Sequence, residues 1–156
     1  MEWSLEYSHA LDLIWFGCDQ SGHILYFTSA GGVFPKSIES KGAKNDVLLS
    51  KLLLLEMREQ SIVYNPDLDK YLKFPKESYK TDYLHNHGEL AKRGFFTFDK
   101  VQYSNGREDL YFLVASPSEP IDQSSLAQDI RELLSKTRYR YNIDESVRTI
   151  SVLDFD

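Results

Sequence analysis

Two apolar runs joined by a short polar turn stand near the start of the chain, in the stretch LDLIWFGCDQSGHILYFTSAGGVFP at residues 11–35. The turn at residues 19–22, DQSG, ends in glycine and separates runs of strand length, which predicts a β-hairpin. Apolar side chains occupy both alternating sets of positions in each run, so both faces of each strand are largely apolar. We therefore expect these strands to lie inside a sheet that is covered on both sides.

The same stretch ends in a glycine pair and a proline, Gly31, Gly32 and Pro35, which favour an exit of the chain from the sheet. A phosphate-binding loop would end in Gly-Lys followed by Ser or Thr, and that ending is absent here. The glycine pair is therefore interpreted as a turn.

Further strands are predicted in the second half of the chain, at 94–101, 110–115 and 147–155, with one more at 138–143. A turn signal at residues 104–106 joins the first two of them. The run at 110–115, LYFLVA, is apolar on both faces, which predicts a central position in the sheet.

Three helices are expected, at residues 46–60, 81–93 and 125–134. The first has Asn45 or Asp46 available as a cap, and its leucines surround most of the helix, so we expect it to be buried on more than one face. Ser125 and Gln128 predict a capping box for the third. Between the first two helices, residues 61–80 are irregular, with one short helical turn.

This order of elements predicts an α+β fold: a mostly antiparallel sheet of about five to six strands, packed with about three helices as a single pair of layers. With 156 residues, the chain is expected to form one globular domain over residues 1–156, because a second core would be small.

Composition indicates a globular protein of the cytoplasm. The content is 42% hydrophobic, and no apolar run approaches the roughly 18–20 residues that cross a bilayer. The opening MEWSLEYSHA lacks the basic and apolar regions of a secretory signal. A single cysteine, Cys18, cannot form an internal disulfide, which fits a reducing compartment. We expect a monomer rather than a homo-oligomer.

The net charge of −6 divides unevenly along the chain. Residues 1–35 carry −4, residues 36–107 carry +3 (13 basic, 10 acidic) and residues 108–156 carry −5 (5 basic, 10 acidic). Negative charge disfavours direct binding to nucleic acid or to an anionic membrane and permits a basic protein partner. It also favours solubility without any partner.

The metal-like pattern in the sequence is His85-Asn86-His87. Residues two apart on a helix point roughly 200° away from each other, so a helical segment could not bring both rings to one ion. In a strand or loop, with Asp82 and Glu89 near, a metal site would become possible.

Other catalytic patterns are absent from the sequence. A Cys–His dyad of Cys18 and His23 is conceivable at the hairpin turn, but the apolar neighbours of Cys18 predict a core residue. The carboxylate pairs at 67/69, 108/109 and 144/145 lie in segments predicted to be exposed, where pKa values stay near normal. No catalytic, metal-ligating or cofactor-binding residue is therefore predicted, and we expect no enzyme activity and no cofactor.

The hairpin stretch WFGCDQSGHILYFTSAGGVFP resembles the "WFG-x-D-x-x-G-x-I-x-x-F-x-S/T-x-G-x-x-P" start of a group of small bacterial immunity proteins. A second block, LAKRGFFTFD followed by YFLVASPSEPI and LAQDIRELL, resembles the rest of that pattern, "rGLfaYD … Y-x-L-v-A-x-P-x-x-P-i" and a short helix. The matching residues are Trp15, Phe16, Gly17, Asp19, Gly22, Ile24, Phe27, Gly31, Pro35, Gly94, Phe98, Asp99, Ala115, Pro117 and Pro120. Cys18, where an aliphatic residue is commoner, and the middle of the chain depart from the pattern.

Such proteins are encoded beside toxins of polymorphic or contact-dependent growth inhibition systems. The resemblance implies that the chain binds and neutralises the C-terminal domain of a cognate toxin in the cytoplasm. Carboxylates would cover the phosphate-binding cleft of a basic, nuclease-type toxin. The candidates are Glu108, Asp109, Asp144, Glu145, Asp154 and Asp156. The alternatives are a small metal-dependent hydrolase that uses His85 and His87 with nearby acids, and a self-associating structural subunit.

Overall fold

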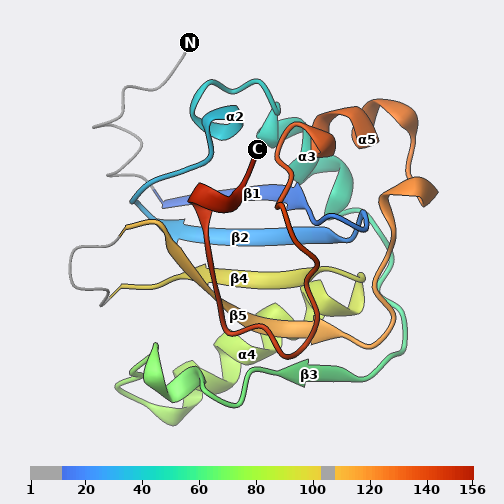
Figure 1. Cartoon of the computed structure of the whole chain (residues 1–156). Helices are drawn as coiled ribbons and strands as arrows, with labels where there is room; N and C mark the ends of the chain where they lie inside the picture. Colours follow the sequence, from blue (N-terminus) through green and yellow to red (C-terminus); the bar gives the residue numbers. More distant parts are fainter. Residues whose placement is uncertain (1–11, 103–107) are drawn as a thin grey trace.

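The computed structural model describes residues 12–102 and 108–156, so the predicted turn at 104–106 lies outside the described residues (Figure 1). The strands are β1 (Asp12–Cys18), β2 (Ile24–Ala30), β3 (Ile62–Tyr64), β4 (Phe96–Lys100), β5 (Leu110–Pro117) and β6 (Thr149–Ser151). The α-helices are α2 (Lys36–Glu39), α3 (Asn45–Leu52), α4 (Glu77–Lys92) and α5 (Gln128–Ser135). Three short 3₁₀ helices are η1 (Leu68–Lys70), η2 (Gln123–Ser125) and η3 (Val152–Asp154).

The strands form one mixed, mostly antiparallel sheet in the order β1-β2-β4-β5-β3, with β6 also paired to β5. Only β2 and β4, among the described pairs, run parallel. The predicted α+β class is confirmed. β5 is central, as its two apolar faces predict. It pairs with β4 on one side; on the other side it pairs with β6 along Leu110–Phe112 and with β3 along Ala115–Pro117. The predicted hairpin is present as β1 and β2.

Strand β1 lies at the edge of the sheet, whereas the sequence predicted an interior position for both hairpin strands. Its outer backbone groups are nevertheless bonded. The Asn45 side chain accepts a hydrogen bond from the Phe16 N–H at 2.9 Å and donates one to the Ile14 carbonyl. Further along, Cys18 exchanges backbone bonds of 3.0 and 2.8 Å with the segment that follows α5. One side chain and one loop thus complete the edge where a strand would otherwise pair.

One face of the sheet is covered by the C-terminal segment, residues 138–156, which crosses in front of the strands in Figure 1. The buried rings of this face are centred on Trp15, whose ring stacks on Phe27 with centroids 3.8 Å apart. Phe155 closes over both rings at 5.6 and 5.7 Å. This cover has little regular structure: of the strands predicted at 138–143 and 147–155, β6 forms, together with two isolated bridges, Cys18–Arg138 and Tyr139–Phe155.

The opposite face carries α3, α4 and α5, while α2 packs through Ile38 in the Trp15 cluster of the first face. Both faces of the sheet are therefore covered, as the apolar strands require. Leu48 and Leu52 of α3 pack with Ile130 and Leu134 of α5 over one half of the sheet. α4 and η1 cover the other half. The predicted pair of layers corresponds to the sheet and these helices, and the C-terminal segment adds a third layer on the other face of the sheet.

The helix expected at residues 46–60 ends at Leu52, and the expectation of burial on several faces is wrong. Leu54 is 80% exposed and Met57 49% exposed. Tertiary contacts hold the following residues out of the helix: the Arg58 N–H donates to the Lys92 carbonyl at 2.9 Å, and Arg93 Nε donates to the Leu55 carbonyl at 3.1 Å. Helix propensity is a weak preference that such contacts override. The described part of the chain contains no helix suited to crossing a membrane.

The predicted capping box is also absent. α5 begins at Gln128 after Ala127, and no side chain caps it. Asp122 instead caps η2, where its carboxylate accepts a bond from the Ser124 N–H at 2.8 Å.

Candidate functional site

Glu108 and Asp109, the first predicted acidic pair, lie where β5 begins. Glu108 is exposed, but Asp109 is 8% exposed, so the prediction that both are exposed is wrong for Asp109. Its carboxylate accepts a hydrogen bond from the Ser151 hydroxyl at 2.5 Å, and its carbonyl accepts one from the Val152 N–H at 2.8 Å. Asp109 therefore fixes η3 to the sheet, and Glu108 alone of this pair faces solvent.

Asp144 and Glu145 are exposed in the loop before β6. The Asp144 carboxylate accepts hydrogen bonds from both the hydroxyl and the N–H of Ser146, the latter at 2.8 Å, and these bonds lower the pKa of Asp144. Asp144 thus stays ionised throughout the physiological range. The neighbouring residue Ile143 bonds to the buried Asp19 at 3.0 Å, so the loop is tied to the hairpin turn.

Asp154 and Asp156 lie beside two arginines of the same segment. The Arg140 N–H donates to the Asp154 carbonyl and the Asp156 N–H to the Arg138 carbonyl, both at 2.9 Å. The Arg140 guanidinium also faces the Asp156 carboxylate, with Nε and Oδ1 3.7 Å apart. Asp156 is thus partly neutralised.

Two apolar side chains project from this acidic segment. Tyr141 is 53% exposed and Leu153 is 69% exposed. They follow and precede the bonded pair Arg140 and Asp154, so their backbones lie on neighbouring stretches of the segment. We define the C-terminal surface as these two residues and the four acids of the segment: Tyr141, Asp144, Glu145, Leu153, Asp154 and Asp156. Four of the six predicted acids belong to this segment, Asp154 and Asp156 beside Arg138 and Arg140, and Asp144 and Glu145 in the loop before β6.

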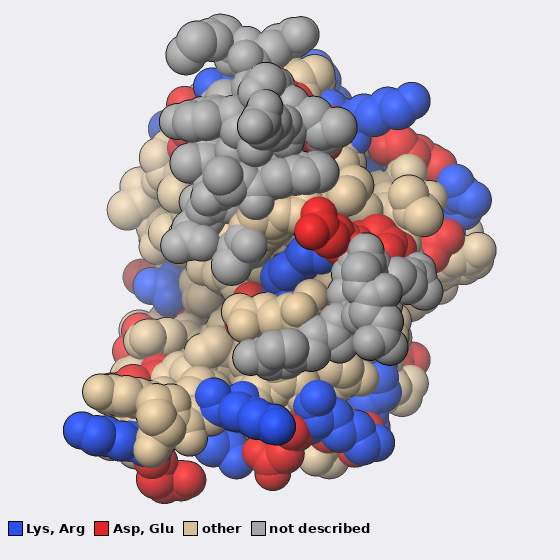
Figure 2. All heavy atoms as spheres, turned by 90° about the vertical axis from the view of Figure 1, so that its left-hand side faces the viewer, with Lys and Arg blue, Asp and Glu red and all other residues tan. Residues whose placement is uncertain are grey.

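The charge of this surface is mixed rather than uniform. Residues 138–156 contain four acids and three arginines, a balance of −1. Arg148 is paired outside the segment with Asp67, at 3.1 Å. On the side of the molecule where β5 begins, acidic and basic side chains are likewise interspersed, so the net charge of −6 is not gathered into one acidic face there (Figure 2).

His85 and His87 point to different sides of α4, as their spacing on a helix predicts. His85 is exposed and pairs with Glu89, with Nε2 and Oε1 2.9 Å apart. His87 is buried against the sheet, where its Nδ1 lies 3.0 Å from the Thr97 hydroxyl, and burial lowers its pKa to about 4. The two rings cannot bind one ion, and no group of three or more metal-ligating side chains occurs within the described ranges.

Cys18 and His23 do not form a dyad. Cys18 is fully buried, its thiol faces the Leu134 carbonyl at 3.6 Å, and burial raises the pKa of the thiol to about 11. His23 Nδ1 instead lies 3.2 Å from the buried Asp19 carboxylate. The predicted core role of Cys18 is confirmed.

A partly buried polar cluster beneath α4 was not predicted. The Asp99 carboxylate accepts hydrogen bonds from the Tyr83 hydroxyl at 2.6 Å and the Thr28 hydroxyl at 3.0 Å. Burial raises the pKa of Asp99, and it also raises the pKa of Tyr83. The sequence shows an acid inside an apolar strand at position 99, which signals a partner, but not that Tyr83 supplies it. The cluster joins α4 to β2 and β4.

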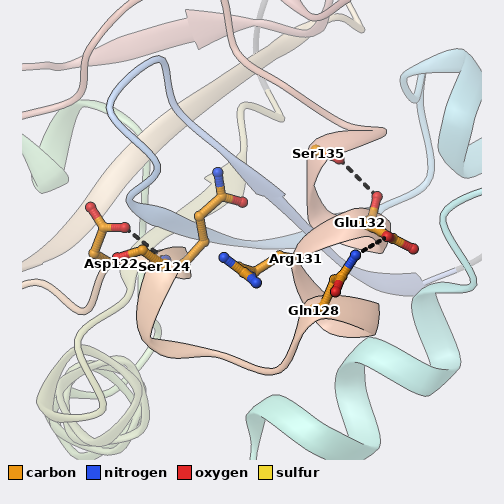
Figure 3. Close-up of a pocket in the computed structure, with 7 residues that line it drawn as sticks. Asp122, Ser124, Gln128, Arg131, Glu132 and Ser135 are labelled. Atoms are coloured by element: carbon orange, nitrogen blue, oxygen red, sulfur yellow. Dashed lines mark hydrogen bonds between the residues drawn. The ribbon is translucent and has the colours of Figure 1, made fainter.

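A polar pocket of about 420 Å³ lies between η2 and α5 (Figure 3). Its lining is polar throughout and contains two acids and one arginine. The lining residues are Asp122, Gln123, Ser124, Gln128, Arg131, Glu132 and Ser135. The Gln128 side-chain N–H donates a hydrogen bond to Glu132 Oε1 at 3.0 Å. Arg131 Nε and Gln123 Oε1 are buried without a hydrogen-bond partner in the described part of the chain. The pocket therefore offers a donor and an acceptor to a small polar group such as water.

Comparisons with protein-family models, with curated proteins and with solved structures return no match. The resemblance drawn from the sequence motifs stays a prediction.

Proposed function

We propose that this chain is an immunity protein, which binds a cognate toxin domain in the cytoplasm and covers its active site or substrate cleft. The observation that supports this proposal best is the C-terminal surface, where Tyr141 and Leu153 are exposed among carboxylates on a segment fixed to the core. Aromatic and aliphatic anchors ringed by polar groups are typical of protein-binding surfaces.

The carboxylates suit a basic partner. Asp144 and Glu145 are exposed and Asp154 is partly exposed on the same C-terminal segment as the apolar pair, and such charges chiefly raise the rate of association and select the partner. A nuclease-type toxin, whose cleft is built to bind phosphate, presents the complementary charge. Because the charge of the segment is mixed, we expect moderate electrostatic steering of the partner. The apolar anchors would then supply the larger share of the binding free energy.

The motif residues support the proposal through the fold. Gly17 lies where an added Cβ would come within 2.6 Å of the Thr137 carbonyl oxygen, and Gly94 where it would come within 2.6 Å of the Ile121 nitrogen. Both glycines permit close approach of two backbones. The motif thus specifies a scaffold, which leaves surface residues free to differ with each toxin.

The test is binding of the purified chain to the C-terminal domain of the toxin encoded by the adjoining gene, measured by calorimetry together with inhibition of that toxin. We expect Tyr141→Ala/Leu153→Ala to weaken binding by at least tenfold, the range of interface anchors. Asp144→Lys/Glu145→Lys should weaken binding at low salt, chiefly by slowing association. Glu108→Lys extends the test to the start of β5; Asp109 is left intact because it is buried.

A matched control is Asp129→Lys/Glu132→Lys, which makes the same charge change on exposed positions of α5. Normal affinity in that control, with loss in the first two variants, would place the toxin on the C-terminal surface. Equal affinity in all variants would reject this surface, and absence of any binding or inhibition would reject the proposed function.

A further inference from the structure

The polar pocket between η2 and α5, here called the η2–α5 pocket, places one positive charge between two negative charges. Figure 3 shows the Arg131 side chain with Asp122 on one side of it and Glu132 on the other. The volume of about 420 Å³ falls within the range of roughly 300–1,000 Å³ that is common for small-molecule sites. The pocket is therefore large enough for a small polar molecule that carries both signs of charge.

The Arg131 guanidinium is the unpaired group of this pocket. It carries several N–H donors, and none of them makes a hydrogen bond or an ion pair within residues 12–102 and 108–156. Its Nε is fully covered by the chain, and so is the unpaired Gln123 Oε1. Covered polar atoms without partners cost free energy, which is why native chains rarely keep them. An anionic group from outside the chain would pair with the guanidinium.

The other lining residues bond to one another and leave both acids able to accept a cation. The Ser135 hydroxyl donates to the Glu132 carbonyl at 2.8 Å, and the Gln128 side chain donates to the Glu132 carboxylate at 3.0 Å. The Asp122 carboxylate accepts the Ser124 N–H at 2.8 Å, and hydrogen bonds from Ser124 lower the pKa of Asp122. An ionised carboxylate has about four acceptor positions, so each acid keeps room for an ammonium group.

We propose that the η2–α5 pocket binds a free basic α-amino acid such as lysine. The α-carboxylate pairs with Arg131, because a guanidinium donates parallel charge-assisted hydrogen bonds to a carboxylate. The α-ammonium pairs with Asp122, and the side-chain cation extends to Glu132. A phosphorylated compound is disfavoured, because it would bring further negative charge beside both acids. No residue of the C-terminal surface lines the pocket, so this site stands or falls independently of toxin binding.

The test titrates L-lysine into the full chain at low salt and follows the backbone amide signals by NMR, which detects weak binding. Saturable shifts in η2 and α5 are expected. Norleucine lacks the side-chain cation, cadaverine lacks the carboxylate, and Nα-acetyl-lysine, which resembles the end of a peptide, lacks the α-ammonium. Each should bind about fivefold more weakly than lysine, the upper range for an exposed ion pair. Absence of saturable shifts, or equal affinity for any of these analogues, would overturn the proposal.

Variants of the pocket assign each charge to its partner. Arg131→Met removes the covered Nε, so it should melt at or above the native temperature, bind lysine about fivefold more weakly and lose the preference for lysine over cadaverine. Glu132→Gln keeps an acceptor for Gln128 and should lose the preference for lysine over norleucine. Asp129→Asn makes the same carboxylate-to-amide change on an exposed position of α5 outside the lining, and this control should bind normally. Native affinity and preference in Arg131→Met or Glu132→Gln would reject the site.

Discussion

At the scale of single residues, the Asp19 side chain connects two distant parts of the chain. Its side chain is fully buried and accepts hydrogen bonds from the N–H groups of Ser21, His23 and Ile143 at 2.9–3.0 Å. It thereby joins the hairpin turn to the C-terminal segment, more than 120 residues away in sequence. These backbone N–H groups explain why the motif has an aspartate at this position, because a short side chain with acceptor oxygens is needed to reach all of them.

We predict that Asp19→Ala lowers the free energy of unfolding by about 3 kcal/mol, because the loss leaves several buried N–H groups without an acceptor. Urea denaturation measures it. The matched control is Asp122→Ala, which removes the cap of η2 and should cost about 1 kcal/mol. Equal losses in the two variants would show that Asp19 is no more than a local turn cap.

At the scale of elements, Asn45 replaces a strand at the edge of β1. We predict that Asn45→Asp destabilises the chain by about 2 kcal/mol, close to the effect of Asn45→Ala. The carboxylate keeps the acceptor for Phe16, but it loses the donor to the Ile14 carbonyl and sets a charged oxygen against that carbonyl oxygen. Hydrogen exchange at the Phe16 amide and urea denaturation check this. Asp46→Ala, on an exposed neighbour, should change little, and a harmless Asn45→Asp would refute the role of the amide donor.

The elements also show what a sequence reveals. The hairpin and β5 were predictable because their signals are local: a polar turn between apolar runs, and apolar residues on both faces of one strand. β3 was not predicted, since three residues in an irregular stretch carry no period. The end of α3 was not predictable either, because it depends on bonds to Lys92 and Arg93 about 35 residues later.

At the scale of the whole molecule, the sequence predicts the layers of the fold better than it predicts the surface that would carry the function. Apolar side chains on both sides of the strands require cover on both faces of the sheet. The structure supplies α3, α4 and α5 on one face, and the C-terminal segment with α2 on the other. That the second cover also carries the exposed Tyr141 and Leu153 could not be read from the sequence, because exposure of an apolar residue depends on what packs around it. The sequence identified the acidic residues, but it could not show which of them lie near one another. Asp109 was predicted to be exposed and is buried, because its exposure too depends on what packs around it.

Burial of His87 makes the stability of the whole molecule depend on pH. Its pKa is about 4 in the folded chain, against 6.5 for an ordinary histidine, so between these values the unfolded chain binds a proton that the folded chain does not. The free energy of unfolding should therefore fall as the pH drops from about 6.5 towards 4, by up to about 3 kcal/mol from this group. The raised pKa of Asp99 acts in the opposite direction at the acidic end, so the net loss in the native chain is smaller.

His87→Gln isolates the contribution, because glutamine offers an acceptor to the Thr97 hydroxyl and does not titrate. Urea denaturation at several pH values should show the stability difference between native chain and variant shift in favour of the variant as the pH falls through this window. His85→Gln, on the exposed side of α4, should follow the native chain at every pH. Parallel curves for the native chain and His87→Gln would mean that the buried imidazole accepts its proton without loss of the fold, which its position between α4 and the sheet argues against.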